Sequence, residues 1–331
     1  MISYLPLSGK YAALREILDG TDLVHGYFEV DYAQVRRRLG AQLRSLRALR
    51  AWAPQLLVYL TLPRSRLRLA SECLFFKMAG IQTIVGAPFR RDLRGHRWLA
   101  AEGRFESEAS RLARCIADLG DARIDLPQSW DLRISARERD SARSVLGSLA
   151  GAGFIGCSVG TGMDAKDWGE ANWGLLLREL GRDFGGRGLV LIGSGADFER
   201  SDRVASAWPG KWLNLCGKIS PRVSAAVLEL AGIYLGHDSG PMHLAAAVGT
   251  PCVANFSARE KPGVWFPFGD QHRILYHQTE CYGCQLKVCV RHDKKCIRSI
   301  TVEEVLAAVR STEWRSISSG ALAGSVRTAI A

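Results

Sequence analysis

The sequence lacks the long apolar runs of a membrane protein: no uninterrupted stretch approaches the roughly 18 residues that a spanning helix needs. Its first residues, 1–6, lack the basic start and the long apolar core of a secretion signal. It also contains no zinc-finger, helix-turn-helix or aromatic RNA-binding pattern. We therefore expect a cytoplasmic protein that has no nucleic-acid partner.

Two common nucleotide-binding motifs are also missing. Neither GxxxxGK(S/T), the phosphate-binding loop of many kinases, nor GxGxxG, the dinucleotide-binding loop, follows any predicted strand. Their absence argues against a kinase and against a simple dehydrogenase.

The nine cysteines are an odd number in a chain without an export signal, which argues against a disulfide framework. Five lie singly in apolar surroundings and are predicted core residues: Cys73, Cys115, Cys157, Cys216 and Cys252. The other four follow the spacing Cys281-x2-Cys284-x4-Cys289-x6-Cys296. This spacing suits a structural Zn or Fe site. Four unligated thiols are the alternative, because the inner spacings are not those of a standard zinc ribbon.

With 331 residues, 47% of them hydrophobic, the chain is long enough for two domains with separate cores. Its net charge of +11 is uneven: residues 1–150 hold 24 Lys and Arg against 16 Asp and Glu, and residues 151–331 hold 20 against 17. Arginine clusters at 36–38 and 64–68 suit an anionic partner such as lipid or a phosphorylated acceptor. A solvated helix face is the alternative for each cluster.

Strand-like and helix-like segments alternate along the chain, which predicts doubly wound, parallel α/β layers. The predicted strands are residues 2–7, 23–30, 56–60, 83–86, 154–158, 188–193, 233–235 and 252–256. The predicted helices are residues 11–18, 32–50, 67–78, 107–119, 136–149, 173–180, 223–230 and 244–248. Residues 88–105 have no clear period and are predicted to be a loop near a site or a surface excursion. A boundary near residues 130–150 separates predicted domains 1–140 and 141–314, followed by a mobile tail, 315–331.

The most informative stretch is residues 230–250, where a short apolar run and an Ala-rich helix flank a polar turn. The turn reads His237-Asp238-Ser239-Gly240-Pro241-Met242-His243. Asp238 or Ser239 can cap the helix, and Pro241 suits its first turn. Such a helix start aims free N–H groups and its positive dipole end at the edge of the sheet, where a phosphate binds well. An ordinary strand-to-helix turn is the alternative.

Two further strand ends carry residues that suit a nucleotide. Thr161 and Lys166 lie in a glycine-containing loop that can hold phosphate oxygens, although a surface loop with a solvated lysine is the alternative. Asp197 or Glu199, after the next strand, can accept hydrogen bonds from ribose hydroxyls, although an acidic helix start explains both equally well. Because the carboxyl ends of parallel strands share a crevice, the joint occurrence of these residues favours a bound nucleotide diphosphate.

The string HDSGPMHLAAAVGTP at residues 237–251, together with Lys166-Asp167-Trp168, resembles glycosyltransferase family 9, the bacterial heptosyltransferases. The similarity extends from about residue 2 to residue 310. It implies a GT-B architecture, in which two Rossmann-like domains face a cleft. In that arrangement the C-terminal domain binds an ADP-sugar and the N-terminal domain binds the acceptor.

The resemblance implies inverting transfer of a heptose or similar sugar to a lipopolysaccharide-core or other surface-glycan acceptor. This transfer would need no metal for catalysis. It would take place at the inner face of the cytoplasmic membrane, with the protein in peripheral contact. Matched by position, the donor-binding residues are Thr161, Lys166, Asp197, Glu199, Asp238, Ser239, Gly240, Pro241, Met242 and His243. Thr161 and Lys166 would contact phosphates, Asp197 or Glu199 the ribose, and residues 238–243 the diphosphate and sugar. Lys166 would stabilise the leaving phosphate.

One element of the family pattern is not found. Family members usually begin with a strand and a glycine-containing loop whose aspartate is regarded as the catalytic base, and this sequence opens at what resembles the second strand. The general base is therefore unassigned. A recorded start downstream of the true one is the favoured explanation. A substitute base is a second, and a catalytically inactive nucleotide-sugar-binding or scaffold protein is a third.

Overall fold

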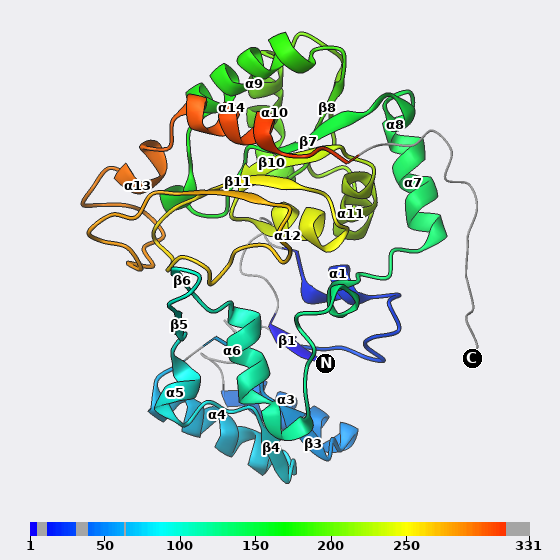
Figure 1. Ribbon diagram of the computed structural model, residues 1–331. Coiled ribbons are helices and arrows are strands. Elements are labelled where there is room, and N and C mark those ends of the chain that lie inside the picture. The colour runs from blue at the N-terminus through cyan, green and yellow to red at the C-terminus, as the bar shows by residue number, and fades with distance from the viewer. Residues whose placement is uncertain (5–11, 31–38, 63, 316–331) are drawn as a thin grey trace, which may run out of the picture.

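The computed structural model describes residues 1–4, 12–30, 39–62 and 64–315. Figure 1 shows the chain as two halves, with the earlier elements below and a large sheet covered by helices above. In the described part of the chain, no helix is both long enough and apolar enough to cross a membrane.

The C-terminal half is built on a six-stranded parallel sheet with the strand order β12-β11-β10-β7-β8-β9. Its strands are β7 (Phe154–Ser158), β8 (Gly188–Leu191), β9 (Trp212–Asn214), β10 (Ile233–His237), β11 (Cys252–Phe256) and β12 (Arg273–Tyr276). From β7 the chain runs outward through β8 to β9, then returns to place β10 on the other side of β7. The strand order therefore reverses between β7 and β10, which is where open α/β sheets bind ligands.

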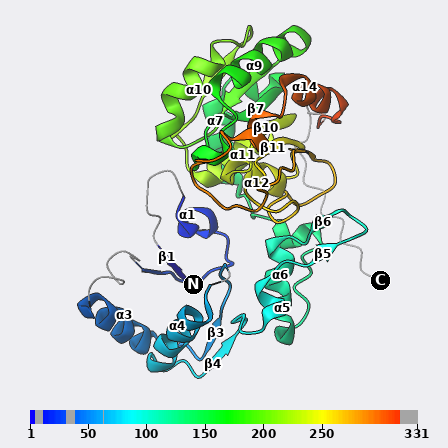
Figure 2. The same cartoon turned by 90° about the vertical axis from the view of Figure 1, so that its left-hand side faces the viewer.

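Helices cover both faces of this sheet (Figures 1 and 2). One core packs beneath α9 (Glu170–Phe184), α10 (Phe198–Ala205), α13 (Lys295–Arg298) and α14 (Val302–Ser311). The second packs beneath α7 (Ala136–Leu146), α8 (Leu149–Ala152), α11 (Pro221–Glu229) and α12 (Gly240–Ala247). The strands β7, β8, β10 and β11 are buried along their whole length, as expected of parallel strands covered on both sides.

The N-terminal half has a looser organisation. Its described strands pair as β1 (Ile2–Tyr4) with β2 (Phe28–Val30) and β3 (Leu56–Val58) with β4 (Thr83–Val85), both parallel, and β5 (Trp98–Leu99) with β6 (Arg104–Phe105), antiparallel. Its helices are α1 (Leu14–Leu18), α3 (Leu39–Trp52), α4 (Arg66–Met78), α5 (Arg91–Arg94) and α6 (Glu108–Cys115). Within the described residues these strands do not join into one continuous sheet.

Several predicted elements differ from the structure. The strand predicted at 23–30 forms only at its end, as β2, and the first residues of the helix predicted at 32–50 lie outside the described residues. In the described part of that helix, Leu49 is buried and Leu46 is half-buried, but Leu39 and Leu43 are 77% and 54% exposed. The aperiodic segment 88–105 contains α5, β5 and β6. The short strands β9 and β12 and the helices α10, α13 and α14 were not predicted, although the buried residues of α14, Val302, Val305, Leu306 and Val309, recur at helical spacing.

The two halves meet through backbone and aromatic contacts. The Phe105 and Glu108 amides donate to the carbonyls of Pro262 and Val264, at 2.8 and 3.0 Å. Elsewhere, the rings of Trp130 and Phe268 stack with centroids 4.8 Å apart. The backbone contacts hold β6 and the start of α6 against the loop that follows β11, and the ring contact holds Trp130 against the same loop.

A further contact between the two halves is centred on Arg222 of α11, whose side chain is 8% exposed. Its guanidinium donates to the carbonyls of Ile17, Leu132 and Arg133. It also forms a bidentate ion pair with Glu138 at 2.5 and 2.9 Å. Burial raises the pKa of Glu138, but hydrogen bonds from Arg222 and Ser135 outweigh it and lower that pKa to about 2. One arginine thereby ties the segment carrying α1 to the C-terminal half.

Helix α9 offers a direct test of the C-terminal core. Replacing the fully buried Leu177 by Ala should lower the free energy of unfolding by about 2–5 kcal/mol, because the substitution leaves a cavity under the sheet. Leu175→Ala, two residues away and 40% exposed, is the matched control and should change it by less. Urea unfolding followed by tryptophan fluorescence measures both; equal effects would contradict the assigned packing.

Candidate active site

A cleft of about 1770 Å³ lies between the two halves and includes the carboxyl ends of β7, β8 and β10. Its C-terminal wall contains Thr161, Lys166, Asp197 and the first turn of α12, and its N-terminal wall contains residues from α5 and α6. Single-ligand pockets usually occupy roughly 300–1,000 Å³. The cleft is therefore large enough for two substrates side by side.

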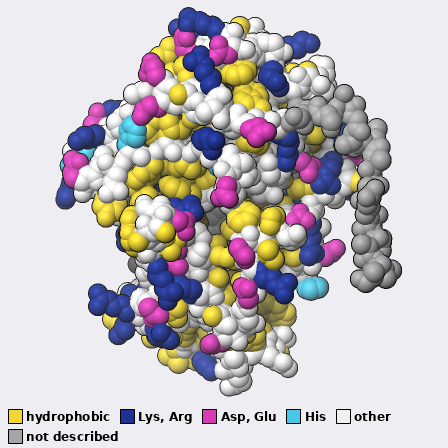
Figure 3. Space-filling model, in the orientation of Figure 1, with side chains coloured by type: hydrophobic (Ala, Val, Ile, Leu, Met, Phe, Trp, Pro, Cys, Tyr) yellow, Lys and Arg dark blue, Asp and Glu magenta, His cyan; other side chains and the backbone are white. Residues whose placement is uncertain are grey.

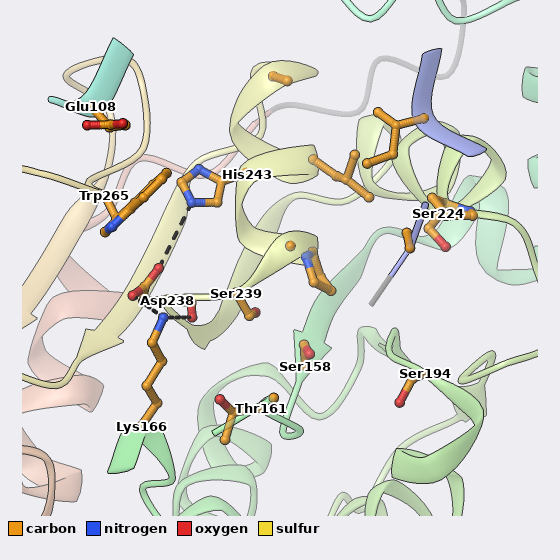
Figure 4. Close-up of a pocket in the computed structure, with 18 of the residues that line it drawn as sticks. Glu108, Ser158, Thr161, Lys166, Ser194, Ser224, Asp238, Ser239, His243 and Trp265 are labelled. Carbon is orange, nitrogen blue, oxygen red and sulfur yellow. Dashed lines mark hydrogen bonds and ion pairs between the residues drawn. The ribbon is translucent and has the colours of Figure 1, made fainter. Parts of the chain in front are cut away.

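Lys166 and Asp238 join the two loops that flank the point where the strand order reverses. Lys166 ends a short turn after β7, and its Nζ lies 2.5 Å from Asp238 Oδ2 and 3.3 Å from the Asp238 carbonyl (Figure 4). Both side chains are largely buried, at 15% and 7% exposure. A paired but accessible cation is therefore held at the start of α12.

The first turn of α12 has no side-chain cap. Ser239 occupies the N-cap position, but its hydroxyl donates to the His237 carbonyl at 3.2 Å instead of accepting from the helix. The predicted capping by Asp238 or Ser239 is therefore wrong, because the Asp238 carboxylate pairs with Lys166. Pro241 has no N–H group, and the Met242 amide donates to the Ser239 carbonyl at 3.1 Å. The amides of Ser239 and Gly240, together with the helix dipole, make this end suited to an anion.

His237, the last residue of β10, accepts hydrogen bonds that hold the loop carrying Lys166. Its Nε2 accepts hydrogen bonds from the Trp168 amide at 3.1 Å and from Trp173 Nε1 at 3.4 Å. Burial lowers the pKa of His237 to about 4, so the ring is neutral near pH 7. This neutral ring fixes the loop that carries Lys166 against β10.

The predicted donor-binding residues divide into those that line the cleft and those that do not. Asp197 lines the cleft, where its carboxylate accepts from the Ser194 amide and hydroxyl at 3.1 and 2.5 Å. A Cβ on Gly160 would lie 2.3 Å from Asp197 Cγ, so this close approach requires glycine. Residues lining the cleft are Thr161, Lys166, Asp197, Asp238, Ser239, Gly240, Pro241 and His243.

Two predicted donor-binding residues lie elsewhere. Met242 is fully buried in the core beneath α12. Glu199 is exposed on α10 and is not among the residues that line the cleft. Of the two acidic candidates for a ribose contact, only Asp197 lines the cleft.

The opposite wall contains a cluster that sequence reasoning missed. His96 Nε2 lies 2.8 Å from Glu108 Oε2, and Arg111 makes a bidentate pair with the same carboxylate at 2.7 and 2.6 Å. Burial raises the pKa of Glu108, but Arg111 and His96 outweigh it and hold that pKa below its usual value. In the sequence, Ser107 followed by Glu108 indicated only a helix start.

The four clustered cysteines do not form a metal site. All four are free thiols, and within the described residues no group of three or more His, Cys, Asp and Glu side chains is arranged to hold a metal ion. The geometry thus does not fit the predicted Zn or Fe set at Cys281, Cys284, Cys289 and Cys296. Backbone bonds dock this segment instead, from Gly283 to the Ala258 carbonyl and from Gln285 to the Arg259 carbonyl.

Comparisons with known proteins agree with this geometry. The model of glycosyltransferase family 9 (heptosyltransferase) matches residues 69–295. Lipopolysaccharide heptosyltransferase 2 of Salmonella typhimurium is 28% identical over 305 residues, which are 83% of this chain and 78% of that protein.

Among solved structures, the glycosyl transferase family 9 protein of Veillonella parvula superposes with a TM-score of 0.68 at 17% identity, covering 90% of this chain and 85% of its own. An Escherichia coli heptosyltransferase solved with ADP-2-deoxy-2-fluoro heptose gives 0.55 at 16% identity, covering 93% and 98%. The predicted GT-B fold is confirmed. Because the family model covers most of the chain and both loops that flank the strand-order reversal, the protein belongs to glycosyltransferase family 9 and is a glycosyltransferase.

Proposed function

We propose that the protein transfers a heptose or similar sugar, with inversion, from an ADP-activated donor to a lipopolysaccharide-core or other surface-glycan acceptor. The observation that carries the proposal is the convergence of Lys166, Asp238 and the uncapped start of α12 in one cleft. The names of the relatives supply the substrate class: one is a lipopolysaccharide heptosyltransferase, and another was solved with an ADP-heptose analogue.

The donor diphosphate would lie between Lys166 and the first-turn amides of α12. When the bond from the sugar to the β-phosphate breaks, negative charge builds up on the departing ADP. An ammonium group and preorganised amides stabilise that charge without a divalent metal. Asp238 would orient Lys166 and the sugar hydroxyls. Thr161 would contact the phosphates and Asp197 the ribose, and both residues line the cleft.

The acceptor would occupy the N-terminal side of the cleft. Residues 1–150 carry a basic surplus, which suits an anionic glycolipid or glycan. On the face of Figure 3, Lys and Arg side chains occur over both halves and alternate with acidic ones. We propose that the basic residues of the N-terminal half attract the acceptor and support peripheral contact with the cytoplasmic face of the membrane. Each basic residue near the membrane surface would contribute about 1 kcal/mol to that contact.

Replacing Lys166 by Ala should lower kcat/KM for ADP release about 10²- to 10³-fold and weaken ADP binding, because the leaving phosphate loses its cation. The measurement is ADP release from ADP-heptose with crude core acceptor, beside calorimetric titration with ADP. Lys211→Ala removes an exposed lysine outside the cleft and should behave as wild type. Unchanged ADP affinity in the Lys166 variant would refute the phosphate assignment.

The same assay separates the enzyme from an inactive relative. ADP binding with acceptor-dependent release supports transfer, whereas ADP binding without any turnover by the wild-type protein would favour a nucleotide-sugar-binding or scaffold protein.

Chelation gives an independent prediction. Because Lys166 and the α12 amides supply the positive charge, EDTA in excess over divalent ions should leave the rate of ADP release unchanged. Loss of activity that added Mg²⁺ restores would show that a metal, and not this cation, stabilises the leaving group.

A further inference from the structure

Trp265, in the loop after β11, places an indole ring in the cleft near the start of α12. The residue is half-buried and lines the cleft. Its ring meets the ring of His243 edge to face, with centroids 6.5 Å apart, and His243 Nε2 lies 4.0 Å from Asp238 Oδ1. Figure 4 shows Trp265 beside His243, with Asp238 on one side of the indole and Glu108 of the opposite wall on the other. The indole therefore lies where the two walls of the cleft approach each other.

The neighbours of Trp265 in the chain fix its position. The carbonyl of the buried Val264 accepts a hydrogen bond from the Glu108 amide at 3.0 Å. The ring of Phe266 packs edge-on against Phe256 of β11, with centroids 4.9 Å apart. Because both flanking residues are anchored, the indole is held in place without a ligand, which lowers the entropic cost of binding one.

The order of the strands arranges the proposed donor contacts in a row. Along the sheet, β8, β7, β10 and β11 are consecutive neighbours. Asp197 follows β8, and Lys166 follows β7. Asp238 follows β10, and Trp265 lies in the loop after β11. Neighbouring strands are about 4.8 Å apart, so the row from β8 to β11 extends over roughly 14 Å.

An ADP-sugar has its parts in a matching linear order, namely ribose, diphosphate and sugar. In the proposed function Asp197 contacts the ribose, and Lys166 with the start of α12 holds the diphosphate. A donor bound in this direction extends its sugar past β10, toward the loop after β11. Trp265 is the aromatic side chain of that loop that lines the cleft.

The chemistry of this indole suits a sugar ring. Pyranose rings present C–H groups on their faces and hydroxyl groups at their edges, and tryptophan combines a large apolar surface with one N–H donor. Among the described residues, none accepts a hydrogen bond from Trp265 Nε1. Trp130, which also lines the cleft, is different: its Nε1 donates to the Ile124 carbonyl at 2.7 Å, and Phe268 covers one face of its ring. Of these two tryptophans, Trp265 is the one whose N–H is available to a ligand.

We propose that Trp265 is the platform on which the donor sugar stacks; the inference rests on the proposed function. The indole packs against C–H groups of the sugar, and its N–H is free to donate to a sugar hydroxyl. ADP alone lacks the sugar and makes no such contact. The contact therefore adds affinity for the ADP-sugar without changing affinity for ADP.

The experiment compares wild type, Trp265→Ala and Trp265→Phe by calorimetric titration with ADP and with ADP-heptose, without acceptor. Trp265→Ala should weaken binding of ADP-heptose about 10-fold and leave binding of ADP within about twofold, because the lost contact involves the sugar alone. Trp265→Phe keeps an aromatic ring and should lose less affinity for ADP-heptose. Trp212→Ala, which removes a 39% exposed tryptophan outside the cleft, is the matched control and should bind both ligands as wild type does.

Two results would overturn the inference. Unchanged affinity of Trp265→Ala for ADP-heptose would show that the sugar does not contact the indole. A loss of affinity that is equal for ADP and ADP-heptose would assign the effect to the fold of the loop. Either result leaves the proposed function standing if the wild-type protein releases ADP from ADP-heptose with acceptor. Wild-type protein that releases none would remove the proposed function and this inference together, so the two failures are distinguishable.

Discussion

The contact between Lys166 and Asp238 is the interaction on which the rest of the site depends. It connects the loop after β7 to the loop after β10, the two neighbouring strands at which the order of the sheet reverses. Holding an ammonium group at 15% exposure is costly unless an anion lies beside it, and the Asp238 carboxylate supplies that anion. The pair keeps a cation at the positive end of a helix, where it would otherwise be repelled.

Several buried groups make this arrangement rigid. His237 accepts from the backbone of Trp168 and from the indole of Trp173, and Trp168 Nε1 donates to the Ile300 carbonyl at 2.7 Å. Asp167 pairs with Arg200 at 2.7 and 3.0 Å, so both residues that follow Lys166 are anchored. These contacts anchor Asp167 and Trp168, whereas Thr161 and Lys166 of the same loop line the cleft.

The parts of the fold predicted well from the sequence are those whose burial does not depend on distant segments. The strands at 154–158 and 252–256 were predicted to the residue, because fully buried parallel strands appear as short apolar runs between helices. The N-terminal half was predicted less well: β3 is partly exposed, and α3 buries few of its leucines. The hydrophobic periodicity of these segments did not predict which of their residues are buried, because tertiary contacts determine which face of each element is covered.

The site divides in the same way. Lys166, Asp238 and the start of α12 follow local signals, namely a strand end and a helix start, and could be placed from the sequence. The pairing of His96 with Glu108 could not, because the two residues are separated by the β5–β6 hairpin. The central claim is that the donor diphosphate binds between Lys166 and the start of α12. A crystal structure with bound ADP tests it most directly: the account predicts the β-phosphate within hydrogen-bond distance of Lys166 Nζ and the amides of Ser239 and Gly240, and ADP bound away from these groups would contradict it.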